Sequence, residues 1–134
     1  MENNVTITIT DNSAEFLEAK NEAVARAMEA CGEMAEGYAV LLCPVDTGNL
    51  RNSISHDSDE ETAIVGTNVE YAPYVEYGTG IHAEGGGRST PWRYKDSDGN
   101  WHTTSGQKPQ PFLRPAIADH TDEYKNLIEE YLKE

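Results

Sequence analysis

SAEFLEAKNEAVARAMEACGEMAEGYAVLL, residues 13–42, is the longest regular pattern in this chain of 134 residues, and it decides the fold class. Apolar side chains recur along it at three- and four-residue spacing, and glutamates occupy much of the remaining surface. This period predicts one long amphipathic helix, which Pro44 ends. Thirty helical residues extend about 45 Å, so we expect part of the helix to pack outside its own core. The apolar positions are Leu17, Val24, Ala27/Met28, Cys31, Met34/Ala35, Tyr38 and Leu41/Leu42.

Three short stretches outside this helix combine glycine, proline, aromatic side chains and one or two charges. They are CPVDTGNLRNSI at 43–54, YAPYVEYGTG at 71–80 and PFLRPAI at 111–117. The first is typical of a helix stop and a turn that feeds a strand, because Asp and Thr bond local amides and Gly frees the backbone. The second and third place proline in the first turn of a helix. We interpret all three as structural joints, with key positions Asp46, Thr47, Gly48, Leu50, Tyr71, Pro73, Tyr74, Gly78, Pro111, Phe112, Arg114 and Pro115.

The remaining elements are expected to be short. Alternating β-branched residues at 5–9 predict a strand, and 50–56 with 62–67 predict a hairpin around an acidic turn. A second hairpin is predicted from 92–95 and 100–103, followed by a terminal helix at 112–132. The order predicts a single α+β domain over residues 1–134, with a small antiparallel sheet, a long N-terminal helix and a C-terminal helix. A glycine-rich, flexible arm is expected at about 81–108.

Composition excludes several classes of function. The chain has 24 acidic and 10 basic residues, a net charge of −14, which is the wrong sign for a general nucleic-acid binder. No apolar run approaches the roughly 20 residues that span a bilayer, and no secretory signal pattern is visible, so we expect the chain to work where it is made. Cys31 and Cys43 would lie about 18 Å apart on one helix, too far for a disulfide.

Charge is unevenly distributed along the chain. Residues 1–48 carry nine acids and two bases, whereas residues 85–110 carry four bases and two acids. The arm is therefore locally basic in an acidic protein, and it also holds Trp92, Tyr94 and Trp101. Such asymmetry suits self-association of a basic segment with an acidic face. An ordinary solvated loop is the alternative.

No catalytic signature is complete. His82-Ala-Glu84 matches part of the zinc-deaminase motif, but both cysteines lie upstream instead of downstream. A single Asp-Thr-Gly lacks the second carboxylate of an aspartic protease, and the aspartates at 96–98 lack the later Glu of a calcium loop. We expect no catalytic, cofactor or metal site. A metal-dependent hydrolase built on His82, Glu84 and His102 is the alternative from another class.

Taken together, the motifs resemble the gene-product-ten-like tail-component family of tailed phages, known as tail-completion, neck or head–tail joining proteins. The resemblance rests on PVDTGNLRNSI at 44–54, VGTN at 65–68, YAPYVEYGTG at 71–80 and PQPFLRPAI at 109–117, in this order. It implies a non-enzymatic virion subunit with an α+β fold. It also implies a homo-oligomeric ring, commonly six-fold in this family, at the head–tail junction.

The resemblance further implies its partners. These are other copies of the chain, the phage connector and tail-tube proteins, with genomic DNA passing through the ring without specific binding and no membrane involved. Assembly is expected in the host bacterial cytoplasm. We expect the arm to form the interface with a subunit or partner, through Arg88, Trp92, Arg93, Tyr94, Lys95 and Trp101. Alternatives are another neck or minor capsid subunit of the same fold, or an acidic regulatory binding module.

Overall fold

The computed structural model describes residues 13–45 and 48–133, with side chains from Leu17 onward. The strand predicted at 5–9, and with it Asp46 and Thr47 of the first joint, lie outside the described residues. The helices are α1 (Ser13–Leu42), α2 (Asn49–Ser53), α3 (Ala72–Tyr77), α4 (Arg114–Ala118) and α5 (Thr121–Leu132), with a 3₁₀ turn at Gly80–His82. The strands are β1 (Ser55–Ser58), β2 (Ala63–Gly66), β3 (Trp92–Lys95) and β4 (Trp101–Thr104).

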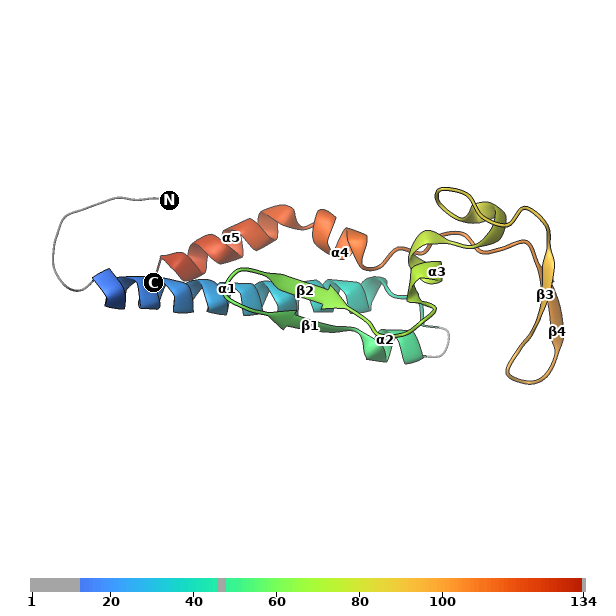
Figure 1. Ribbon diagram of the computed structural model, residues 1–134, viewed down its shortest axis with the longest axis horizontal. Helices are drawn as coiled ribbons and strands as arrows, with labels where there is room; N and C mark the ends of the chain where they lie inside the picture. The colour runs from blue at the N-terminus through green and yellow to red at the C-terminus, as the bar shows by residue number, and fades with distance from the viewer. Residues whose placement is uncertain (1–12, 46–47, 134) are drawn as a thin grey trace.

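Helix α1 runs along the length of the body of the molecule (Figure 1). The β1–β2 hairpin and the α4–α5 pair both pack along it. Helices α2 and α3 lie near its C-terminal end, and the β3–β4 hairpin stands apart at the same end of the molecule (Figure 1). This arrangement confirms the α+β class, the long N-terminal helix and the C-terminal helix.

The antiparallel strands are divided between two hairpins. β1 pairs only with β2, from Ser55 opposite Gly66 to Ser58 opposite Ala63, and β3 pairs only with β4. Both hairpins were predicted, and the described residues do not join them into one sheet. Each of the four strands therefore has one edge that no other described strand covers.

A stripe of small residues lets the other elements approach α1 closely. Its buried positions recur every four residues: Ala23, Ala27, Cys31, Ala35, Ala39 and Cys43. Because a helical turn takes 3.6 residues, a stripe with this spacing winds around the helix instead of running straight along one side. The larger side chains expected in the apolar stripe include Leu17, Leu41 and Leu42, which are exposed. Both cysteines are buried free thiols, and burial raises the pKa of each.

The main core lies at the C-terminal end of α1. Phe112 is its largest fully buried side chain, and it packs in one cluster with Leu50 and Ala116. These residues come from the first and third joints, which are more than 50 residues apart in the sequence. The joints thus meet in the core.

The strand predicted at 50–56 is wrong in its first half. Residues 49–53 form helix α2, and the strand begins only at Ser55. Leu50 and Ile54 are both buried in the main core. In either conformation, residues four apart lie on the same side of the chain. A helical turn brings the two side chains close together, whereas an extended strand would hold them about 13 Å apart. Packing against the same core selects the compact arrangement.

The terminal helix predicted at 112–132 is broken after Ala118. Asp119 ends α4, and α5 begins at Thr121. The ring of His120 at the break stacks on Tyr38 of α1, and the Tyr124 hydroxyl donates a hydrogen bond of 2.5 Å to the Ala116 carbonyl across the break. The break lets α4 fill the core while α5 turns to follow α1.

Candidate functional site

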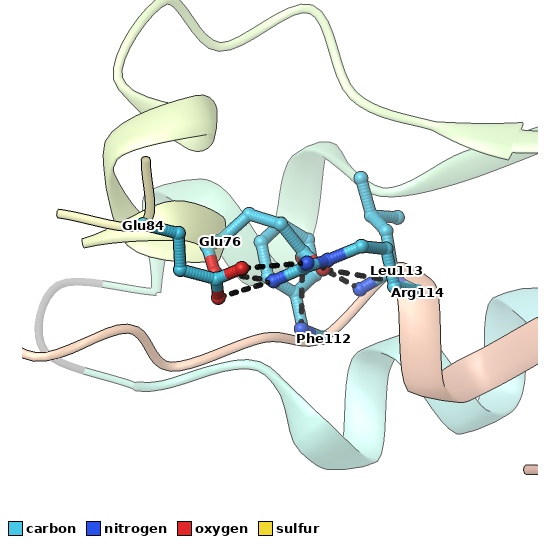
Figure 2. Close-up of polar contacts among 5 residues, drawn as sticks. All are labelled: Glu76, Glu84, Phe112, Leu113 and Arg114. Atoms are coloured by element: carbon cyan, nitrogen blue, oxygen red, sulfur yellow. Dashed lines mark hydrogen bonds and ion pairs between the residues drawn. The ribbon is translucent and has the colours of Figure 1, made fainter. Parts of the chain in front are cut away.

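A buried carboxylate joins the second and third joints. Glu76 of α3 is only 3% exposed. Its Oε1 accepts hydrogen bonds of 2.9 Å from the backbone amides of Phe112 and Leu113, and its Oε2 accepts one of 3.1 Å from the Arg114 amide (Figure 2). These amides point out of the start of α4, where a helix favours negative charge. Glu76 therefore anchors the start of α4 to α3.

The side chain of Arg114 completes this contact. Its Nε donates to Glu76 Oε2 at 2.8 Å, and its terminal nitrogens donate to both oxygens of Glu84 at 3.1 and 2.9 Å (Figure 2). The guanidinium also lies over the Tyr77 ring, 4.4 Å from its centroid. We call Glu76, Glu84 and Arg114 the clasp. It ties α3, the start of α4 and the segment after the 3₁₀ turn to one another.

The clasp fixes the ionisation of its members. Burial raises the pKa of Glu76, but hydrogen bonds from the Leu113 amide, the Arg114 side chain and the neighbouring amides outweigh it, so the pKa lies below its usual range. Bonds to Glu84 and then Glu76 raise the pKa of Arg114, and the Arg114 bond lowers the pKa of Glu84. All three groups are therefore charged at neutral pH.

The two chain segments that lead into and out of the arm run side by side next to the clasp. The amides of Thr79 and Ile81 donate to the carbonyls of Gln107 and Ser105 at 2.9 and 3.0 Å. Gly80 and Gly106 face each other there, and a Cβ on either would collide with the opposite backbone. Both also have positive φ, 61° and 121°. Glycine at these two positions therefore allows the two backbone segments to pack closely at the base of the arm.

The arm itself ends in the β3–β4 hairpin. Its two strands contact each other extensively, and neither packs extensively on any other described helix or strand. Side chains alternate between the faces of a strand. With Lys95 opposite Trp101 and Arg93 opposite Thr103, one face carries Arg93, Lys95 and Trp101. We call it the Trp101 face. Arg93 and Lys95 stand 5.0 and 5.8 Å from the Trp101 ring centroid.

The opposite face of the hairpin carries Trp92, Tyr94 and His102. Tyr94 stacks on His102 with 5.3 Å between ring centroids, and Arg88 lies 5.4 Å from the Trp92 ring centroid. The six residues predicted as an interface are thus all in the arm, but in two groups on opposite faces. Trp101 is 57% exposed and Trp92 is partly covered.

The described residues of the three stretches predicted as joints lie at or beside the ends of helices. Gly48 has φ 76° and immediately precedes α2, Tyr71 and Gly78 flank α3, and Pro73 lies in the first turn of α3. Arg114 and Pro115 begin α4, directly after Pro111 and Phe112. Tyr74 is 63% exposed. The prediction missed Glu76 and Gly106. A single acid within the aromatic turn YVEYG was the available signal for Glu76.

The alternative metal site is not assembled. Glu84 is bonded to Arg114, and His102 Nε2 lies 2.6 Å from Asp96 Oδ2 on its own hairpin. Within the described ranges, the residues whose ligand atoms come close enough for a metal ion are Glu29, Glu33 and His56. His56 is already engaged there, with Nε2 at 2.8 Å from Glu29 and Nδ1 at 2.8 Å from Glu36. Sequence reasoning did not identify this contact between α1 and β1.

Among the described residues, no helix is long and apolar enough to cross a membrane.

Comparison with protein-family models gives a match to part of the chain. Residues 8–78, just over half of the chain, match the family model described as "Bacteriophage HK97-gp10, putative tail-component". No curated protein and no solved structure matches. The matched region contains α1, the first hairpin and Glu76, and it ends before the arm. The chain belongs to the HK97 gp10-like family of phage tail components.

Proposed function

We propose that this tail component is a non-enzymatic subunit of the phage neck. In this proposal, copies form a ring, six-fold in the simplest case, around the DNA channel where the head connector meets the tail. The family assignment supports a structural role in the virion. The observation that carries the joining role is the arm, which projects from the body and whose base is held by the clasp (Figure 1).

The chemistry of the arm suits a protein interface. Trp, Tyr and Arg are the residue types that dominate binding energy at interfaces. Trp101 and Tyr94 are 57% and 44% exposed, although apolar rings of this size favour burial. A short, paired hairpin on a fixed base also loses little conformational freedom on binding. We therefore propose that Arg88, Trp92, Arg93, Tyr94, Lys95 and Trp101 contact a neighbouring subunit or an adjacent tail protein.

The net charge suits a conduit for DNA. A protein with 24 acidic and 10 basic residues repels phosphate overall. We propose that DNA passes through the ring without being held, and that the ring binds the connector on one side and the tail tube on the other. Assembly would take place in the host bacterial cytoplasm.

Negative-stain imaging of the purified protein, with and without tail tubes, tests this proposal. We expect rings capping the tube ends and restored joining of heads to tails that lack the protein. The Trp92→Ala/Trp101→Ala variant should fold but fail to join, whereas the control Tyr74→Ala, at an exposed aromatic position on α3 outside the arm, should join normally. Full joining by the double tryptophan variant would contradict the role of the arm.

A second candidate function is an acidic binding module, which the net charge of −14 favours. Such a module would form a stable complex with one basic protein and would form no ring. A minor capsid or other neck subunit of the same fold would form an assembly but would not cap tail tubes. The same images therefore separate all three candidates.

A further inference from the structure

An open apolar groove runs beside α1, on the side where no other described element covers it. Its floor is formed by Cys31, Gly32 and Ala35, the small residues of the helix, and its volume is about 290 Å³. One wall is β2, and the other is made by α4 and α5 through Ile117, Tyr124 and Ile128. Small floor residues make the groove deep, because a larger side chain on α1 would fill it.

The rims of the groove are apolar and uncovered. Ile64 on the β2 rim is 63% exposed, and Ile117 on the α4 rim is 47% exposed. The β2 edge at the groove has no partner strand among the described residues, because β1 occupies the other edge. Large exposed aliphatic side chains that face each other across a groove are typical of a binding surface.

One end of the groove is strongly acidic. The turn between β1 and β2 holds Asp59, Glu60 and Glu61, and Glu61 lines both the groove and a hollow beside it. Asp59 is committed to the turn, because its Oδ1 accepts the amides of Glu61 and Thr62 at 2.7 and 2.8 Å. Glu60 and Glu61 are exposed and pair with no cation among the described residues. The groove therefore combines an apolar channel with two unneutralised carboxylates at its end.

The Trp101 face of the arm has the complementary composition. It presents one large exposed ring flanked by two cations, Arg93 and Lys95, at 5.0 and 5.8 Å from the ring centroid. The ring matches the apolar channel, and the cations match the acidic turn. Complementary charge of this kind selects the partner and its orientation.

A chain cannot fill its own groove in this arrangement. The hairpin lies beyond the C-terminal end of α1, whereas the groove lies beside the middle of that helix (Figure 1). The clasp and the backbone pairing at Thr79 and Ile81 hold the base of the arm in that direction. The occupant must therefore come from another copy.

We propose that the Trp101 face of one copy docks in the groove between β2 and α4–α5 of the next copy, with Arg93 and Lys95 against Glu60 and Glu61. This inference rests on the proposed self-assembly and names the surface that receives the arm. Arm and groove are different surfaces, so each copy can give one contact and receive one. Such a heterologous contact closes into a ring when the rotation between copies allows it.

Photo-cross-linking of the full chain tests the docking. Trp101 is replaced by p-benzoylphenylalanine, and the protein is irradiated both at high concentration and on assembled tails. Cross-links are expected between copies, on the peptides that contain residues 61–65 or 117–128. Cross-links between copies that fall on another surface, or none between copies in either setting, would overturn the docking.

Charge exchange tests the orientation. Association measured by analytical ultracentrifugation should weaken by about 30-fold or more in Trp101→Ala, the loss expected of an interface hot spot. Tyr74→Ala, which removes a 63% exposed aromatic ring on α3 outside the arm, is the matched control and should change little. Arg93→Glu/Lys95→Glu and Glu60→Lys/Glu61→Lys should each weaken association, and the two combined in one chain should restore it. Equal losses in Trp101→Ala and Tyr74→Ala, or no restoration in the combined variant, would contradict the docking.

The two proposals fail in different ways. Rings that join tails but carry Trp101 cross-links only on the tube protein would remove the docking and leave the neck function. Copies that dock arm to groove but never cap a tail tube would remove the neck function and leave the docking.

Discussion

At the scale of single residues, Glu76 anchors the base of the arm. Its carboxylate accepts hydrogen bonds from three amides and a guanidinium in a segment more than 30 residues away. Its neutralisation would leave the three amides without a charged acceptor, although the guanidinium would keep Glu84 as a partner. An unsatisfied buried donor is destabilising by itself, in addition to the loss of the bond.

Glu76→Gln should therefore lower the free energy of unfolding by about 2–3 kcal/mol, because hydrogen bonds to a buried, charged acceptor are lost. The amide has a single oxygen acceptor and places an NH₂ group against other donors. Glu84→Gln is the matched control, since Glu84 is exposed, and it should have a much smaller effect. Urea unfolding of the three proteins measures this. Equal losses in the two variants would show that burial of Glu76 does not matter.

His56 provides a pH-dependent contact between α1 and β1. Both ring nitrogens face carboxylates, Glu29 and Glu36, so both must carry protons to donate. Hydrogen bonds to Glu29 and then to Glu36 raise the pKa of His56 above its ordinary value, more than its burial lowers it. A raised pKa in the folded state adds stability that is fully present below the unfolded pKa of about 6.5 and is lost as pH rises through the folded pKa.

The stability of the wild-type protein relative to His56→Gln should therefore fall as the pH rises above about 6.5. Glutamine keeps a donor near the carboxylates but does not titrate. Urea unfolding of both proteins across this range gives the difference at each pH. A difference that stays constant with pH would mean that the two carboxylates do not raise the pKa of His56 in the folded state.

At the scale of elements, α1 is built to be approached closely. Gly32 is buried under His56, and a Cβ there would lie 2.6 Å from His56 Cδ2. Gly37, one and a half turns later, is exposed with no atom within 4 Å of such a Cβ. The two glycines therefore differ in role, although they weaken an isolated helix equally.

Gly37→Ala should stabilise the protein by up to about 1 kcal/mol through helix propensity. Gly32→Ala should instead destabilise it by about 1–3 kcal/mol, because the methyl group forces β1 away from α1. Thermal unfolding of the two variants decides between them. If both alanines stabilised the protein, the close packing of β1 on α1 would be wrong.

At the scale of the whole molecule, acidic and basic charges are separated between the body and the arm. The body is acidic, and the arm that projects from it is locally basic. Residues 85–110 have four bases and two acids, whereas the whole chain has a net charge of −14. At low salt, where charges act over long distances, the repulsion of DNA by the whole chain therefore outweighs its attraction to the arm.

Filter binding at low salt should therefore detect no appreciable affinity for duplex DNA. Arg88→Glu/Arg93→Glu, which makes the arm acidic, should leave that result unchanged. Salt-sensitive binding in the micromolar range, abolished by these substitutions, would mean that the arm contacts DNA instead of protein.

Local patterns allowed much of the fold to be predicted. The period of residues 13–42 predicts α1, and the turn Asp96-Ser-Asp-Gly99 predicts the second hairpin, because both depend on neighbours in the sequence. The strand expected at 50–56 and the single helix expected at 112–132 were wrong. At these places, burial of Leu50 and Ile54 and the stacking of His120 on Tyr38 outweigh local preference.

The sequence by itself determined the family, the long helix and the aromatic, basic character of the arm, because each is carried by short stretches of the chain that can be recognised without their tertiary contacts. Only the tertiary structure decided that Glu76 meets Arg114, that Trp92 and Trp101 lie on opposite faces of the hairpin, and that an apolar groove with an acidic end lies beside α1. The reason is physical, because these features depend on segments that are distant in the sequence. The Glu76 carboxylate binds Arg114, and the small residues of α1 form the floor of a groove, only when those segments pack together.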